Sequence, residues 1–156
     1  MPENTEVDKY LEKMKKDDDK FHEELEASIT ELQDMFDIDD RNLHKEFMRV
    51  CGNMQRYCDK IARYEKELVK IKRFRDKLYN DRYEELKLHG TVVLKSQHEY
   101  DVWISKSSNY IRVCSYCDTL KVLISHCADS AANLKQLGFI LQTMVKNREL
   151  EGGPTF

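Results

Sequence analysis

Proline is nearly absent from this chain, and glycine is scarce. The 156 residues include two prolines, at positions 2 and 154, and five glycines, so the stretch between those prolines contains no proline at all. Proline and glycine are the residues that most often end helices and make turns. Because 35% of the residues are also charged, the composition favours long helices over sheets.

The chain also lacks a long hydrophobic run and a secretory signal. No apolar run approaches the roughly 18 residues that a membrane-spanning helix needs. The cysteines are odd in number and have no secretory context, which does not favour a disulfide framework. They are Cys51, Cys58, Cys114, Cys117 and Cys127. We therefore expect a soluble protein of a reduced intracellular compartment.

Motifs for catalysis and metal binding are missing as well. There is no P-loop, Gly-rich phosphate cradle or nucleophile elbow, and the five histidines are dispersed. The spacing of Cys114 and Cys117 suggests metal or redox chemistry, but a structural zinc site needs a second pair of ligands. The candidates are His126 and Cys127, and Cys127 falls with Cys117 on an apolar repeat. We predict no enzyme activity, no cofactor and no metal site, and a zinc or redox role is the third-ranked hypothesis.

What the sequence does contain is apolar residues at helical spacing. Residues 1–20 are polar and acidic, and we interpret them as a flexible or partner-ordered extension, with a helix from Val7 as an alternative. Residues 21–36 repeat apolar side chains every three or four positions, which predicts an amphipathic helix. Acids and asparagine then cluster over residues 37–42, where Asp39 or Asp40 is suited to cap a helix. From about residue 41 to 89 the apolar steps alternate four and three, as in a coiled coil, and Gly90 is suited to end this helix.

The C-terminal half predicts a connector and one more long helix. Residues 90–98 form the connector, which is irregular or a short β segment, and residues 149–156 form a tail. The helix over residues 99–148 carries apolar side chains on more than one face, so it must be buried against several neighbours. We therefore predict a mainly α fold that associates as a homo-oligomer through residues 99–148. The residues expected in the subunit interface or its supporting core are Val113, Leu120, Ile124, Ala131, Leu134 and Leu141.

The charges are distributed unevenly along the chain. Residues 1–46 carry 16 acids and 7 bases, whereas residues 56–82 carry 10 bases and 5 acids. Residues 83–156 carry 8 of each. The whole-chain net charge of −3 therefore conceals a basic segment in the middle of the second helix.

Within this basic segment the cations recur at helical spacing, so they lie along one side of the helix. We call these residues the cation ridge: Lys60, Arg63, Lys66, Lys70, Arg73 and Lys77. Aromatic residues are interleaved with them, and cations combined with aromatic platforms are typical of single-strand binding. We predict that the ridge, with Arg82, contacts phosphates and that Tyr83 is a stacking residue. An ordinary solvated helix face explains the ridge equally well when it is considered alone.

Four segments are specific in their order and spacing. They are Ile38-Asp39-x-x-Asn42-Leu43-His44-x-Glu46, Lys77-x-x-x-x-Arg82-Tyr83-Glu84, Val93-Leu94-Lys95 leading through Asp101 to Trp103-Ile104, and Arg148-Glu149-Leu150-Glu151-Gly152. Together they resemble the UvsY family, the recombination mediators of T-even-type bacteriophages. The similarity spans roughly residues 23–153, and residues 1–20 look like an extension that the family does not need.

The resemblance implies a non-enzymatic accessory factor in the cytoplasm of an infected bacterium. Such proteins form ring-like homo-oligomers, hexamers or heptamers, and bind single-stranded DNA. They help the RecA-like recombinase UvsX to load onto DNA covered by the phage single-strand-binding protein. The family's DNA-contacting motif has two cations two positions apart. Arg82 matches the second, but Asn80 stands at the first, and Lys77 lies one turn earlier.

The alternative is a coiled-coil scaffold or adaptor without nucleic-acid binding. The same apolar repeats serve that hypothesis equally well, and the basic face would then only confer solubility. Binding to single-stranded DNA that weakens steeply with salt separates the two hypotheses.

Overall fold

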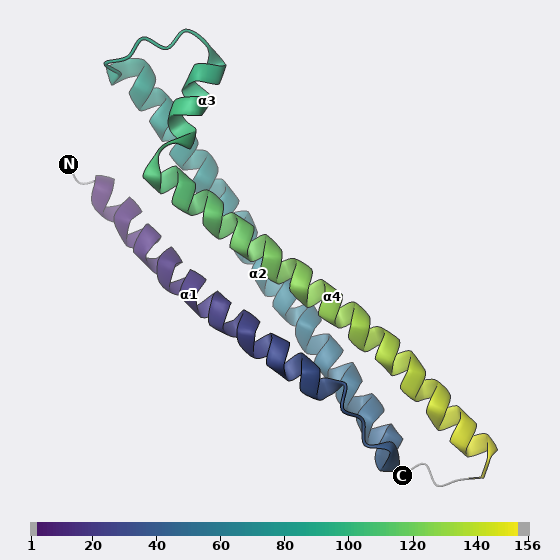
Figure 1. The fold of residues 1–156 in the computed structure, drawn as a ribbon. Helices are drawn as coiled ribbons and strands as arrows, with labels where there is room; N and C mark the ends of the chain where they lie inside the picture. Colours follow the sequence, from purple (N-terminus) through teal and green to yellow (C-terminus); the bar gives the residue numbers. More distant parts are fainter. Residues whose placement is uncertain (1–2, 153–156) are drawn as a thin grey trace. The chain divides into compact units, whose positions relative to one another are not determined.

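The protein is described by a computed structural model over residues 3–152, with side chains from residue 7 onward. Helix α1 spans Glu3–Met35, and a 3-10 helix, η1, spans Asp40–Asn42. Helix α2 spans Leu43–His89, α3 spans Gln97–Ser105, and α4 spans Ser108–Leu150 (Figure 1). No strand occurs within residues 3–152, so the predicted mainly α fold is confirmed.

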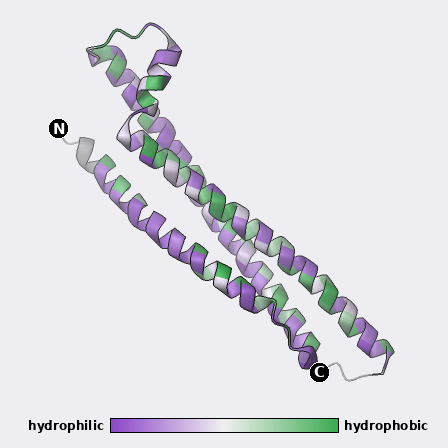
Figure 2. Ribbon diagram, in the orientation of Figure 1, coloured by the Kyte–Doolittle hydropathy of each residue, from purple (hydrophilic) through white to green (hydrophobic). Residues whose placement is uncertain are grey.

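The chain forms two compact units, and each contains parts of α1, α2 and α4. The first unit combines residues 1–20 with residues 65–121, which include α3. The second unit combines residues 21–64 with residues 122–156. Of the long helices, α1 is hydrophilic along most of its length (Figure 2). None of the helices over residues 3–152 is long and apolar enough to cross a membrane.

The core of the second unit is built by the coiled-coil repeat of α2. Along α2 a buried apolar residue recurs every seven positions, and this heptad spacing keeps one side of the helix packed against its neighbours. Phe21 from α1 meets the Tyr64 ring edge-on, with ring centres 5.3 Å apart. The buried apolar residues of this unit are Met35, Leu43, Val50, Tyr57, Tyr64, Leu123, Cys127, Leu134 and Leu141.

The turn between α1 and α2 belongs to the second unit and follows the predicted chemistry. Asp39 caps η1 by accepting a hydrogen bond from the Arg41 amide at 3.0 Å. Asn42 caps α2 by accepting from the Lys45 amide at 3.2 Å. The cap of the long helix, predicted at Asp39 or Asp40, is Asn42, because a 3-10 turn lies between Asp39 and α2.

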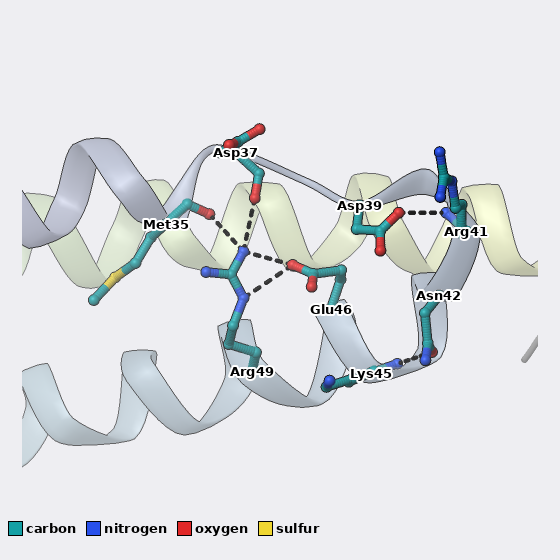
Figure 3. A network of polar contacts seen from close by, with 8 residues as sticks. All are labelled: Met35, Asp37, Asp39, Arg41, Asn42, Lys45, Glu46 and Arg49. Atoms are coloured by element: carbon teal, nitrogen blue, oxygen red, sulfur yellow. Dashed lines mark hydrogen bonds and ion pairs between the residues drawn. The ribbon is translucent and has the colours of Figure 1, made fainter.

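A guanidinium fastens this turn to α2. Figure 3 shows Arg49 between the carbonyl oxygens that end α1 and the carboxylate of Glu46. Its Nη2 atom donates to the Asp37 carbonyl at 2.9 Å and to the Met35 carbonyl at 3.4 Å. Its Nε atom donates to Glu46 Oε2 at 2.9 Å. Arg49 therefore satisfies backbone acceptors that the end of a helix leaves without partners.

Residues 3–20 differ from the flexible extension that the sequence analysis expected. They form the N-terminal half of α1 and pack within the first unit. Leu11 and Met14 are buried, and the Tyr10 ring lies 4.2 Å from that of Phe74 in α2. These three residues of α1 are spaced as on one helix face, and that short stripe is sufficient to bury the segment. The other buried apolar residues of this unit are Ile71, Ile104, Val113, Tyr116, Cys117 and Leu120.

The end of α2 requires glycine. The Gly90 amide donates to the Leu86 carbonyl at 3.1 Å, and a Cβ at Gly90 would lie 2.3 Å from that oxygen. The chain then runs without helix or strand until Ser96, which caps α3 by accepting from the Glu99 amide. The expected irregular connector is therefore confirmed, and it contains no β segment.

The single helix predicted over residues 99–148 is two helices. The chain leaves α3 at Lys106 and Ser107, whose amides bond back to the carbonyls of Trp103 and Ile104, and α4 begins at Ser108. Serine side chains compete with the helical hydrogen-bond pattern, and residues 105–108 read Ser-Lys-Ser-Ser. This serine cluster is the sequence feature that accompanies the break.

Candidate nucleic-acid interface

The cation ridge lies on α2, and its members have different surroundings in the two units. Lys60 and Arg63 belong to the second unit, whereas the ridge from Lys66 to Lys77 belongs to the first. Lys60 is half-buried, and the other ridge residues are exposed.

In the second unit α1 already engages the ridge cations. The Arg63 guanidinium forms an ion pair with Glu24 of α1 at 2.8 Å. The Lys60 ammonium donates to the Ser28 hydroxyl at 3.2 Å. A phosphate that binds Lys60 or Arg63 must therefore displace side chains of α1 or share the cations with them.

A buried phenol strengthens this contact. The Tyr64 hydroxyl donates to Glu24 at 2.6 Å and accepts from Arg63 at 3.2 Å. Burial raises the pKa of Tyr64 well above its ordinary value, and the hydrogen bond to Glu24 raises it further. The phenol therefore stays protonated and holds the Glu24 carboxylate beside Arg63.

In the first unit three ridge cations are free of protein partners. Within the described residues, the side chains of Lys66, Arg73 and Lys77 form no hydrogen bond or ion pair. Lys70 lies among them and forms an exposed pair with Glu67 at 3.4 Å, a contact of the kind that contributes little to stability. Because these four residues are three or four positions apart on a helix, they form one continuous basic strip. We call Lys66, Lys70, Arg73 and Lys77 the open strip.

Arg82 does not join the open strip. It lies five residues beyond Lys77, which turns its side chain roughly 140° around the helix axis. Its guanidinium forms an ion pair with Glu85. The structure therefore separates Arg82 from the cations with which the sequence analysis had grouped it.

Tyr83 belongs to a cluster of tyrosines that packs α2 against α3 and the start of α4. Its ring centre lies 4.7 Å from that of Tyr100 and 6.4 Å from that of Tyr79. Tyr79 in turn lies 6.3 Å from Tyr110, and its hydroxyl bonds Asp101. The bonds from Tyr79 and Gln97 lower the pKa of the Asp101 carboxyl. The Tyr83 ring thus has internal neighbours, and its stacking on a base remains a prediction.

The predicted subunit-contact residues lie mostly inside the single chain. Val113 and Leu120 are buried in the first unit, and Leu134 and Leu141 in the second. Ile124 and Ala131 are half-buried. Among these residues the four buried ones are suited to the supporting core rather than to a direct contact between subunits. The large apolar residues that α4 does expose are Ile111, Val122, Phe139, Ile140 and Leu150.

The five cysteines are free thiols. Within residues 3–152 no three His, Cys, Asp or Glu residues come together in a way that could hold a metal ion. Cys117 and Cys127 are buried, and burial raises the pKa of both thiols. A raised pKa keeps a thiol protonated and therefore unreactive.

No protein-family model matches the chain, and no curated protein sequence matches it. Solved structures do match it in fold. A crystal structure of the recombination mediator protein UvsY of bacteriophage T4 superimposes with a TM-score of 0.70 at 18% identity, covering 81% of this chain and 98% of that one. A second UvsY crystal structure, in another lattice, gives 0.68 at 18% identity and covers 82% and 97%. The helices described above are therefore arranged in the fold of UvsY.

Proposed function

We propose that this protein is a single-stranded-DNA-binding recombination mediator. It helps a RecA-like recombinase of the UvsX type to load onto DNA that is covered by a phage single-strand-binding protein. The fold of a recombination mediator supports the role. The observation that carries the DNA-binding part is the open strip, in which three exposed cations lack protein partners.

The open strip is suited to a phosphate backbone because it is regular and accessible. Neighbouring residues at this spacing lie roughly 5–6 Å apart on a helix surface. Each phosphate neutralised on a single strand lowers the slope of log affinity against log salt by about 0.7. Four contacts from one subunit would therefore give a slope of roughly −3.

No bond is made or broken in this role. Binding energy stabilises one protein–DNA complex at the expense of another, so that the single-strand-binding protein is exchanged for the recombinase. A homo-oligomer, a hexamer or heptamer by resemblance, would present several open strips to one strand. Repetition of a weak site raises the overall affinity by orders of magnitude when the geometry permits simultaneous contact.

The decisive experiment reverses charge on the open strip. In Arg73→Glu/Lys77→Glu we expect at least a tenfold loss of affinity for a fluorescent oligo(dT), because favourable phosphate contacts become repulsive. The matched control is Lys135→Glu/Lys146→Glu, which reverses two exposed cations of α4. Helicity by circular dichroism should be equal in all three proteins. Unchanged oligo(dT) affinity of the first variant at moderate salt would overturn the proposal.

The second candidate is a scaffold or adaptor that binds no nucleic acid. One observation favours it: Lys60 and Arg63, two of the six ridge cations, are already paired with α1. A chain that used the whole ridge for DNA would be expected to leave those two open. Titrations of oligo(dT) at several salt concentrations separate the candidates, because a scaffold shows no salt-dependent binding.

A further inference from the structure

The face of α2 that packs on α1 in the first unit continues toward the end of α2. Phe74 contacts Tyr10 of α1, and Asp81 and Leu88 follow at intervals of seven residues, so they repeat the position of Phe74. Asp81 and Leu88 line a groove of about 760 Å³ in the first unit, together with Val7 of α1.

Several apolar side chains line this groove. Leu78 of α2, Ile104 of α3 and Tyr110 of α4 line it, together with Leu88. The side chain of Leu88 is 71% exposed, which is unusual for a leucine on the packing face of a helix. Apolar side chains in this position contribute to stability only when another surface covers them.

Charged side chains also line the groove. They are Asp81, Glu84, Glu85, Lys77, Arg82 and His89. Glu85 is paired with Arg82, whereas Asp81, Glu84 and Lys77 form no ion pair within the described residues. The two unpaired carboxylates outnumber the one unpaired ammonium, so the groove favours a cationic ligand over a phosphate.

We propose that this groove docks an amphipathic helix of a partner protein, with lysine or arginine beside its apolar stripe. The apolar stripe covers Leu78 and Leu88, and the cations meet Asp81 and Glu84. This is recognition of a helix in a groove. Docking of such a helix does not require that the open strip bind DNA.

The charges of the groove also indicate whether its occupant is another protein or a second copy of this chain. The helix that packs on this face, α1, carries 12 acids and 5 bases over Glu3–Met35. A second α1 placed against Asp81 and Glu84 would be repelled, because like charges across an interface are unfavourable. The groove therefore fits a basic helix from another protein.

A synthetic peptide tests the proposal on the full chain. The probe is a labelled amphipathic helix of roughly five turns, with leucine along one side and lysine on both flanks, followed by fluorescence anisotropy. We expect Asp81→Lys/Glu84→Lys to weaken binding at least tenfold. Both residues are exposed, and substitutions at exposed positions usually change stability little, so the fold should persist.

An apolar variant and matched controls make the test specific. Leu88→Gln should weaken peptide binding, whereas Val69→Gln, at another exposed apolar residue of α2, and Glu65→Lys should not. The same peptide with glutamate in place of lysine should not bind the wild-type protein. Equal losses in the controls, or no binding of the lysine peptide, would overturn the proposal. A fall in oligomer mass caused by Leu88→Gln would overturn it in favour of contact between copies.

Discussion

At the scale of single residues, two side chains join helices that are distant in the sequence. Arg49 of α2 donates to the carbonyl of Met35, the last residue of α1, to the Asp37 carbonyl in the following turn, and to the Glu46 carboxylate. Tyr64 of α2 bonds Glu24 of α1, which also holds Arg63. In each contact a partly buried carboxylate, that of Glu46 or Glu24, accepts hydrogen bonds from these side chains. Removing the donor therefore leaves the carboxylate without its hydrogen bond.

We expect Arg49→Met to lower the free energy of unfolding by about 1–3 kcal/mol, because hydrogen bonds to charged groups are worth that much when partly buried. Glu46 would then be left with a side chain only 12% exposed and without its cation. Thermal denaturation followed by circular dichroism measures the loss. Arg49→Met/Glu46→Met is the control and should recover part of it; an unchanged melting temperature for the single variant would contradict the role of Arg49.

Tyr64 predicts a loss of stability in alkali. Its pKa in the folded chain is raised, first by burial and then by Glu24. A group with a raised pKa contributes stability below its unfolded value, which is about 10 for tyrosine, and loses that contribution as pH rises toward the folded pKa. The contribution of Tyr64 should therefore be complete at neutral pH and decline above about pH 10.

The measurement is the free energy of unfolding in urea between neutral pH and strongly alkaline pH. Tyr64→Phe should flatten the alkaline decline without abolishing it, because burial also raises the pKa of Tyr57 and Tyr116. A decline identical to that of the wild type would show that Tyr64 is not among the groups responsible.

At the scale of the helices, three glycines have different surroundings. Gly90 ends α2, where a Cβ would collide with the Leu86 carbonyl. Gly52 lies inside α2 with open space around it, and Gly138 lies inside α4 with Phe47 and Val50 at 3.9 Å from a Cβ. The spacing of apolar residues does not reveal these surroundings, because it does not show which side chains of other helices lie near a glycine.

We expect Gly52→Ala and Gly138→Ala each to raise the free energy of unfolding by about 0.5–1 kcal/mol. Alanine restricts the unfolded chain and favours helix, and neither new methyl group meets an atom closer than ordinary van der Waals contact. Gly90→Ala should instead destabilise the end of α2. Urea denaturation of the three variants checks the order; a stabilised Gly90→Ala protein would contradict the steric argument.

At the scale of the whole molecule, the expected assembly depends on apolar side chains that the single chain leaves exposed. Phe139 and Ile140 of α4 are 60% and 56% exposed, whereas Leu134 and Leu141 on the same helix are buried. Exposed neighbouring apolar residues are typical of surfaces that another protein covers. The two kinds of position should therefore respond differently to substitution.

In Phe139→Glu/Ile140→Glu we expect light scattering to give a lower oligomer mass while the helicity is kept. Leu134→Asp should instead reduce the helicity itself, because it places a charge in the core of the second unit. Ile124→Asp, at a half-buried position, should lower the mass with partial loss of stability. A monomeric wild-type protein would contradict the predicted assembly at once.

The order of the helices, the turn at residues 37–42 and the irregular connector were all predictable from the sequence. The spacing of apolar residues and the capping residues are local properties of the sequence. They can therefore be recognised without knowing which helices pack against one another. The break at Lys106 and Ser107 was missed because the apolar repeat continues through it. The packing of residues 3–20 was missed because a short apolar stripe in a polar segment becomes stable only when a neighbour covers it.

The sequence by itself determined that cations recur along one side of a long helix, and it determined nothing about their partners. Tertiary structure alone decided that Lys60 and Arg63 are held by α1, while Lys66, Arg73 and Lys77 stay open. It also formed the groove in the first unit, which is lined by residues of all four α-helices. The physical reason is that helical periodicity is set by bonds between near neighbours, whereas the availability of a charge depends on a side chain some forty positions away.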